Sequence, residues 1–281
     1  MARGRLLAVR NVAKAWLLLG GLVSALFAFG WWLGGFRLGS VFFVVGLLMA
    51  ATVHWYGPRV VLASLRAREL PLAEAPALHS TVESLAAKAG VERPRLFLLA
   101  DGHPRALAVG RGASWSGLAL SEGLLGMMSP AELEGVAAHL LGRVRHRDVV
   151  VETPAVVVAG WLVEASRIGG WLERALLFVL GPVAASIVQL LLSPKRVLAA
   201  DAFAAGVCES PHPLADALVR LEQAQELISF QASPTTEPVY VVNPFEPVGL
   251  AAMFHTHPVL AERVQRLRDL DPEWRERLRA A

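Results

Sequence analysis

The clearest chemical spacing in this chain lies in one short stretch, residues 129–148, which contains the run Ala-Ala-His-Leu-Leu-Gly-Arg. Two histidines four residues apart on a helix share one face and bind one zinc ion, and a glutamate after the first histidine activates a bound water. His139 occupies the first position, but Leu140 replaces the glutamate and Arg143 the second histidine. The stretch therefore predicts a zinc helix that keeps one ligand and lacks its general base.

The same stretch has the signals that begin a helix. Ser129 suits the N-cap, Pro130 suits the first helical position, and Glu132 completes a capping box. Leu140 belongs to an apolar stripe that should face the core, with His139 on an adjacent face. That stripe consists of Leu133, Val136, Ala137, Leu140 and Val144.

Three other segments carry a family resemblance. Residues 104–110 read P-R-A-L-A-V-G, 193–201 read S-P-K-R-V-L-A-A-D, and 254–263 read F-H-T-H-P-V-L-A-E-R. Together with 129–148 they resemble the HtpX-type membrane metallopeptidases, relatives of the CAAX-prenyl endopeptidase, over nearly the whole chain. The resemblance implies a mainly α fold with a small β-sheet (α+β), in an integral membrane protein with a zincin-type cytoplasmic domain.

The departures from the family pattern fall on the residues that hold and use zinc. Val197 stands where the family places its third ligand, a glutamate. The vestigial positions are His139, Leu140, Arg143 and Val197. We therefore expect no catalytic residue, no bound metal and no cofactor, where the family uses zinc. The terminal family motif is kept at Thr256, His257 and Pro258.

Other histidines offer a replacement metal site only with difficulty. His139 and His146 are separated by about 10.5 Å along a straight helix, too far to share one ion. His255 and His257 are close enough to chelate weakly with a third partner, which the sequence does not supply.

Arg143 is predicted to fill the old metal space with a fixed positive charge. A buried cation needs a carboxylate, and Asp201 is the expected partner because its family counterpart lies near the metal. Such an ion pair would join two helices as zinc does. The alternative is that Arg143 reaches solvent.

Two apolar runs near the N-terminus predict a transmembrane hairpin. Residues 15–36 and 38–57 each approach the roughly 20 residues that cross a bilayer. Basic residues precede the first run and follow the second, while the linker holds only Arg37. The positive-inside rule then places the N-terminus and the following domain in the cytoplasm, at the bacterial plasma (inner) membrane. A signal peptide is the alternative for the first run.

A second apolar pair, residues 149–166 and 175–192, is expected to span as well, or else to pack on the domain. Glu152 should then lie near an interface or face protein. The predicted division is a basic N-terminus (1–14), a hairpin (15–57), a cytoplasmic domain with the sheet and degenerate helix (58–148), a second hairpin (149–192) and a cytoplasmic helical part (193–281).

Short alternating runs at 95–99, 106–109 and 117–120 predict the strands of the small sheet. The edge formed by Ala106, Leu107, Ala108 and Val109 is a candidate for binding an extended peptide by strand addition. The alternative is that this edge only covers the helix.

Composition limits the remaining functions. Hydrophobic residues make up 54% of the chain, which favours membrane segments, and a net charge of +3 gives no basic surface for nucleic acid. Cys208 is the single cysteine, so no internal disulfide forms.

The function predicted from these features is that of a pseudoprotease in protein quality control. It would lie in the bilayer and bind or regulate membrane proteins, a peptide or a partner complex. The alternatives are an active endopeptidase with a rearranged zinc site and a structural subunit of a membrane complex.

Overall fold

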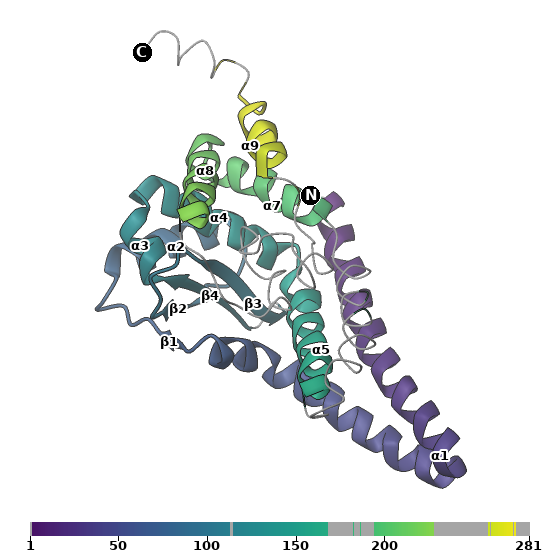
Figure 1. Cartoon of the computed structure of the whole chain (residues 1–281). Coiled ribbons are helices and arrows are strands. Elements are labelled where there is room, and N and C mark those ends of the chain that lie inside the picture. Colours follow the sequence, from purple (N-terminus) through teal and green to yellow (C-terminus); the bar gives the residue numbers. More distant parts are fainter. Residues whose placement is uncertain are drawn as a thin grey trace.

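The computed structural model describes residues 2–112, 115–167, 194–227 and 260–271, together with positions 182, 186, 258 and 273. It is mostly helical with a small mixed sheet, which confirms the predicted fold class (Figure 1). Its helices are α1 (Ala2–Ser64), α2 (Pro76–Ala89), α3 (Glu122–Met127), α4 (Pro130–Arg145), α5 (Val149–Arg167), α7 (Pro194–Val207), α8 (His212–Leu227) and α9 (Leu260–Arg268).

Helix α1 doubles back on itself and forms a long hairpin beside the rest of the chain (Figure 1). The reversal lies at Gly34 and Gly35, and Gly35 has a φ of 69°, which favours glycine. The two arms pack closely, since a Cβ at Gly46 would lie 3.1 Å from the Cα of Val23. The stretch Ala8–Ser64 is long and apolar enough to cross a membrane.

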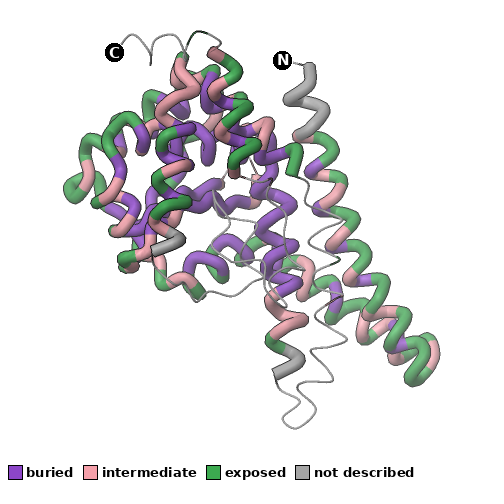
Figure 2. The backbone as a smooth tube through the Cα atoms, turned by 45° about the horizontal axis from the view of Figure 1, so that its top comes forward, coloured by how far each residue is buried: buried purple, intermediate pink, exposed green. Residues whose placement is uncertain are grey.

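Burial changes along this hairpin in a consistent way. Its far part is largely exposed, whereas Val53, Val61 and Leu62 are buried where the second arm meets the domain (Figure 2). The second arm therefore continues past the apolar run to pack against the sheet.

The sheet has strands β1 (Ala67–Glu69), β2 (Arg95–Leu99), β3 (Ala106–Gly112) and β4 (Trp115–Ser121), in the order β1-β2-β4-β3. Strand β2 is parallel to β4, and the two outer pairings are antiparallel. Side chains alternate between the faces: Ala106 and Ala108 join one core and Leu107 and Val109 the other.

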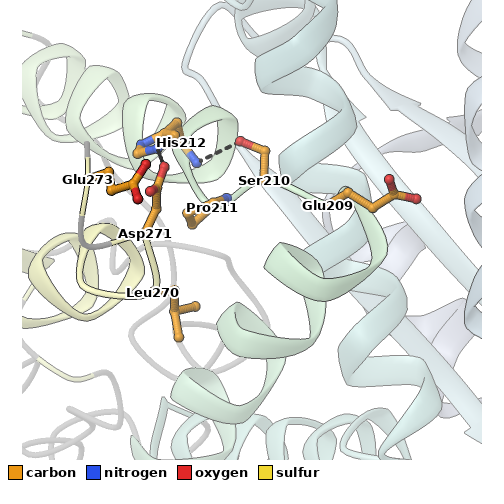
Figure 3. A pocket seen from close by; sticks show the side chains of 7 residues that line it. All are labelled: Glu209, Ser210, Pro211, His212, Leu270, Asp271 and Glu273. Carbon is orange, nitrogen blue, oxygen red and sulfur yellow. Dashed lines mark hydrogen bonds and ion pairs between the residues drawn. The ribbon is translucent and has the colours of Figure 1, made fainter. Parts of the chain in front are cut away.

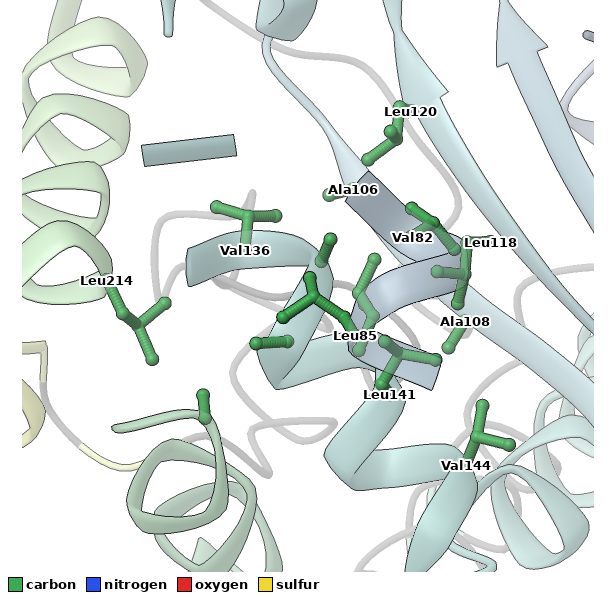
Figure 4. Packing of buried hydrophobic residues seen from close by; sticks show 14 of the residues in the cluster. Val82, Leu85, Ala106, Ala108, Leu118, Leu120, Val136, Leu141, Val144 and Leu214 are labelled. Atoms are coloured by element: carbon green, nitrogen blue, oxygen red, sulfur yellow. The ribbon is translucent and has the colours of Figure 1, made fainter. Parts of the chain in front are cut away.

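Helices cover both faces of the sheet. Val82 and Leu85 of α2 and Leu141 of α4 pack with Leu118 and Leu120 on one face (Figure 4). The opposite face is covered by the end of α1 and by Val156–Val158 of α5. Helix α4 is thus the central helix, because α7 and α8 contact its other side.

Close contacts between α4 and its neighbours depend on glycine. A Cβ at Gly135 would lie 2.7 Å from the backbone N of Leu214 in α8. A Cβ at Gly142 would lie 3.2 Å from the carbonyl oxygen of Ala200 in α7. These approaches place the polar side chains of α4 and α7 within reach of each other.

Helix α5 is the first arm of the predicted second hairpin. Residues 149–159 are all buried, against α1 and β3 rather than open to lipid. The second arm, 175–192, lies outside the described residues apart from positions 182 and 186.

Candidate functional site

The start of α4 agrees with its sequence signals. The Ser129 side chain accepts from the backbone N–H of Glu132 at 3.3 Å, and the Ser129 N–H donates to the Glu132 carboxylate at 2.7 Å. This capping box fixes where the helix begins, and therefore which residues its buried side presents.

His139 lies at the centre of the first of two ionic clusters on α4. Its ring is fully buried, and Nδ1 lies 2.7 Å from Oδ1 of Asp201 on α7. Asp201 in turn accepts two hydrogen bonds from Arg263 of α9, from Nε and Nη2, each 2.8 Å long. We call these three residues the His139 cluster.

The charge states in the His139 cluster follow from burial and pairing. Burial lowers the pKa of His139 to about 4, so the imidazole is neutral at physiological pH. Burial alone would raise the pKa of Asp201, but Arg263 and His139 hold it well below its usual range. Nδ1 of His139 faces Asp201, but neither Nδ1 nor Nε2 meets hydrogen-bond geometry with a partner among the described residues. A neutral imidazole with Nδ1 beside a carboxylate and Nε2 without a partner there resembles the arrangement of a metal-ligating histidine.

Arg143 lies one turn further along α4, at the centre of the second cluster. Its side chain is 1% exposed, and Nη2 lies 2.6 Å from Oε2 of Glu152 on α5. Arg196 of α7 contacts the other oxygen of Glu152 at 3.2 Å and lies 3.6 Å from Asp148. We call Arg143, Glu152, Arg196 and Asp148 the Arg143 cluster.

The Arg143 cluster also holds the N-terminal helix. Nδ2 of Asn11 in α1 donates to Oδ1 of Asp148 at 2.7 Å and to the backbone oxygen of His146 at 3.0 Å. Burial raises the pKa of Asp148 to about 6. Polar side chains from α1, α4, α5 and α7 are therefore joined with Asp148 in one buried network.

The predicted ion pair between Arg143 and Asp201 is wrong, and so is the alternative that Arg143 reaches solvent. Asp201 lies opposite His139, one turn earlier in α4, where Arg263 already occupies both carboxylate oxygens. The carboxylate for Arg143 comes instead from Glu152. The sequence had marked Glu152 as a charge needing a protein partner, but it gave no sign that the partner was Arg143.

The other vestigial positions are apolar and buried. Leu140 is completely buried in the main core, and Val197 is 8% exposed. Neither has an atom that can bind a metal or accept a proton. Asn11, Asp148, Arg196 and Arg263 were missed as site residues, although all but Asn11 stand in motifs that the sequence matched.

The described residues do not fit a zinc ion on this helix. His139 offers one nitrogen, but a guanidinium and a valine stand at the positions to which the resemblance assigns the other two ligands, and zinc in proteins takes three or four ligands. In the described ranges no three His, Cys, Asp or Glu side chains are grouped to hold a metal. His255, Thr256 and His257 lie outside the described residues, and Pro258 is half-buried.

The predicted peptide-binding edge is an edge strand. β3 ends the sheet, but Ala106–Val109 are buried. The backbone N–H of Ser121 donates to the carbonyl oxygen of Arg105. In an antiparallel pair, the backbone N–H and C=O groups of Ala106, Ala108 and Gly110 therefore point away from β4. On that outer side the N–H of Gly110 bonds to Thr153 of α5 at 3.3 Å. An added strand would have to displace what covers this edge.

A separate hollow lies between the α7–α8 turn and the end of α9 (Figure 3). There Nε2 of His212 lies 2.7 Å from Oδ2 of Asp271, and Ser210 Oγ accepts from the backbone N–H of His212. The serine thus meets the backbone and not the imidazole, so these residues do not form a Ser-His-Asp relay. The contact ties the start of α8 to the residues after α9.

Comparison with known proteins places the chain in a family. Residues 72–271 match Peptidase family M48. The chain is 34% identical to the "Protease HtpX homolog" of Pelotomaculum thermopropionicum, covering 92% of this chain and 98% of that protein. The homologue of Persephonella marina is also 34% identical, with 92% and 97% covered. Ste24p of S. mikatae has a TM-score of 0.49 at 21% identity, covering 95% of this chain and 66% of that one.

The fold and the helix with its single remaining ligand define a chain of the membrane metallopeptidase class. This chain belongs to peptidase family M48, as the HtpX-type resemblance predicted. The prediction that no cofactor is involved is thereby wrong, because M48 is a family of zinc metallopeptidases. Zinc is the cofactor to measure, even though the described residues of α4 supply a single ligand for it.

Proposed function

We propose that this chain is a membrane-bound M48 family member without peptidase activity, which acts by binding or regulating membrane proteins or a partner complex. The observation that carries the proposal is Leu140. Peptide hydrolysis in this family needs a glutamate carboxylate beside the first histidine to take a proton from water. Leu140 has no such group, and its side chain is part of the core.

The neighbouring carboxylates do not replace that base. Glu152 is fixed between Arg143 and Arg196, and both of its oxygens are occupied. Asp201 has a depressed pKa and accepts from Arg263. Asp201 is therefore a poor base at neutral pH, because the positive charge of Arg263 stabilises its ionised form.

A direct assay tests the loss of activity. Purified full-length chain with added zinc should give no chelator-sensitive cleavage of an unfolded membrane-protein substrate. The matched positive control carries Leu140→Glu, Arg143→His and Val197→Glu together, which should raise zinc per chain and restore measurable cleavage. Cleavage by the native chain that is lost with chelator and in His139→Ala would overturn the proposal and support an active enzyme with rearranged ligands.

Partner capture separates the binding role from that of a structural subunit. Crosslinking in intact membranes should trap a mixture of membrane proteins that grows when damaged membrane proteins accumulate. One partner at constant stoichiometry under all conditions would instead support the structural subunit.

We further propose that the chain lies in the bacterial plasma membrane with its N-terminus and domain in the cytoplasm. Support comes from the basic residues that flank the apolar hairpin and from Arg37 as the single charge at its tip. In a Cys208→Ser background, Arg37→Cys should react with an impermeant maleimide from outside intact cells. Lys88→Cys should react only after the membrane is opened, and the reverse pattern would overturn the orientation.

A further inference from the structure

Two arginines at the junction of hairpin and domain have no carboxylate within ion-pair distance in the described structure. Cζ of Arg111 lies 4.9 Å from the ring centre of Trp55, and Cζ of Arg59 lies 5.8 Å from that of Tyr56. Arg68, by contrast, lies 2.7 Å from Glu74. Among the described residues, no carboxylate therefore neutralises the positive charge of Arg59 and Arg111.

These arginines line one small pocket built from two distant parts of the sequence. Trp55, Pro58 and Arg59 come from the second arm of α1, while Arg111 and Trp115 come from β3 and β4. The packing of α1 on α5 and on the sheet brings the two parts together. The pocket therefore exists only when the hairpin is docked on the domain.

The pocket lies at the level where an aromatic belt marks the edge of the apolar hairpin. Trp16 of the first arm stacks on His54 of the second, with ring centres 5.8 Å apart. Trp16, Trp55 and Tyr56 are 63%, 57% and 52% exposed, so they lie on the outer surface. Exposed Trp and Tyr at the end of an apolar run are typical of the headgroup region of a bilayer.

We propose that the two arginines at the rim of this shallow hollow, Arg59 and Arg111, bind the phosphate of an anionic phospholipid headgroup in the leaflet next to the domain, beside Trp55 and Trp115. A guanidinium donates two parallel hydrogen bonds to phosphate, and stacking on an aromatic face leaves its donor edge free to do so. The acyl chains would then lie along the exposed apolar surface of the hairpin. The inference rests on the hairpin spanning the membrane and is independent of peptidase activity.

Native mass spectrometry of the detergent-purified full chain tests this site. Phosphatidylglycerol should be retained in preference to phosphatidylcholine. The double variant Arg59→Gln, Arg111→Gln should weaken retention about tenfold, as expected for the loss of charge-assisted hydrogen bonds. Arg37→Gln, which removes an exposed unpaired arginine at the opposite end of the hairpin, is the matched control and should leave retention unchanged.

Three results would overturn the inference. The first is equal retention of the two lipids, and the second is equal retention by the double variant and the control. The third is displacement of the lipid by millimolar inorganic phosphate, which would indicate a site for the free anion. If the glutamine variant does not fold, Arg59→Lys with Arg111→Lys keeps the charge and loses the bidentate geometry. Retention by that lysine variant should fall between those of the native chain and a chain without these charges, and unchanged retention would count against the site.

Discussion

The His139 cluster and the Arg143 cluster lie one turn apart on the same helix, are both buried, and differ in what they preserve. In the His139 cluster the imidazole keeps a free Nε2 and the support of Asp201 and Arg263. In the Arg143 cluster a guanidinium stands where the second ligand belongs and takes a carboxylate from α5. The two clusters therefore differ in the charge that α4 presents, a neutral imidazole in one and a guanidinium in the other.

The ion pair that supports His139 contributes to the stability of the fold. Asp201 and Arg263 form a buried ion pair with two hydrogen bonds, and removing one member of such a pair costs about 3–5 kcal/mol where no other group can neutralise the remaining charge. That cost applies whether or not a metal is bound.

The largest effect should come from breaking the Arg143 cluster at Glu152. Glu152→Ala removes a carboxylate that lies 2.6 Å from the buried guanidinium of Arg143, and we expect a loss of about 3–5 kcal/mol in the free energy of unfolding. Thermal and denaturant unfolding in detergent will measure it. The control is Glu152→Ala combined with Arg143→Met, which should recover most of the loss. A single variant as stable as the native chain would show that the pair contributes little.

Breaking the His139 cluster should cost less, about 2–3 kcal/mol, because one member can adjust its charge. In Arg263→Met, Asp201 loses its cation, and His139 can take up a proton to replace it. The loss should therefore be smaller at pH 6 than at pH 8. Melting temperatures of the native chain and the variant at both pH values will test this, and an equal loss at both would argue against proton uptake by His139.

The close approach of α4 and α7 holds the two clusters in place, and a methyl group should loosen it. In Gly142→Ala the new Cβ would lie 3.0 Å from Cδ1 of Phe203 and 3.2 Å from the Ala200 oxygen, so we expect a loss of about 1–3 kcal/mol. Gly206→Ala in α7 is the matched control. It meets nothing within 4 Å and should be neutral or gain up to about 1 kcal/mol in helix propensity. Similar changes in unfolding midpoint for both variants would contradict this reason.

Local patterns predicted the elements of this chain better than the contacts between them. The capping box at Ser129, the apolar stripe through Leu140 and the strand at 106–109 follow from neighbouring residues, and the structure confirms them. Strand β1 has only three residues, too few for alternation to show. Its place in the sheet follows from pairing with β2, which sequence alone does not supply.

The carboxylate that pairs with Arg143 could not be predicted from neighbouring residues in the sequence. Any buried carboxylate satisfies a buried guanidinium, and the choice between Asp201 and Glu152 depends on how α5 and α7 pack around α4. The family resemblance placed Asp201 near the metal position, which is correct for His139 but one turn away from Arg143. Asn11 carries no motif, and its contact with Asp148 arises because α1 packs beside the end of α4.

The smallest expected effect is on the pH dependence of stability, to which the two clusters contribute with opposite signs. His139 has a folded pKa of about 4 against an ordinary 6.5, so between these values the unfolded chain binds more protons and stability rises with pH. Asp148 has a folded pKa of about 6 against 3.8, so the native chain binds more protons there and stability falls as pH rises. The two contributions oppose each other between about pH 4 and 6.

Asp148→Asn should expose the His139 contribution. It removes the opposing titration and leaves an amide oxygen that Asn11 can still donate to. Relative to the native chain, the variant should then gain about 1–2 kcal/mol more stability between pH 4.5 and 6. Unfolding midpoints across that range will measure the difference in slope, with titrations common to both proteins cancelling. Parallel curves would mean that Asp148 stays ionised in the folded chain because Arg196 and Asn11 stabilise its charge more than burial opposes it.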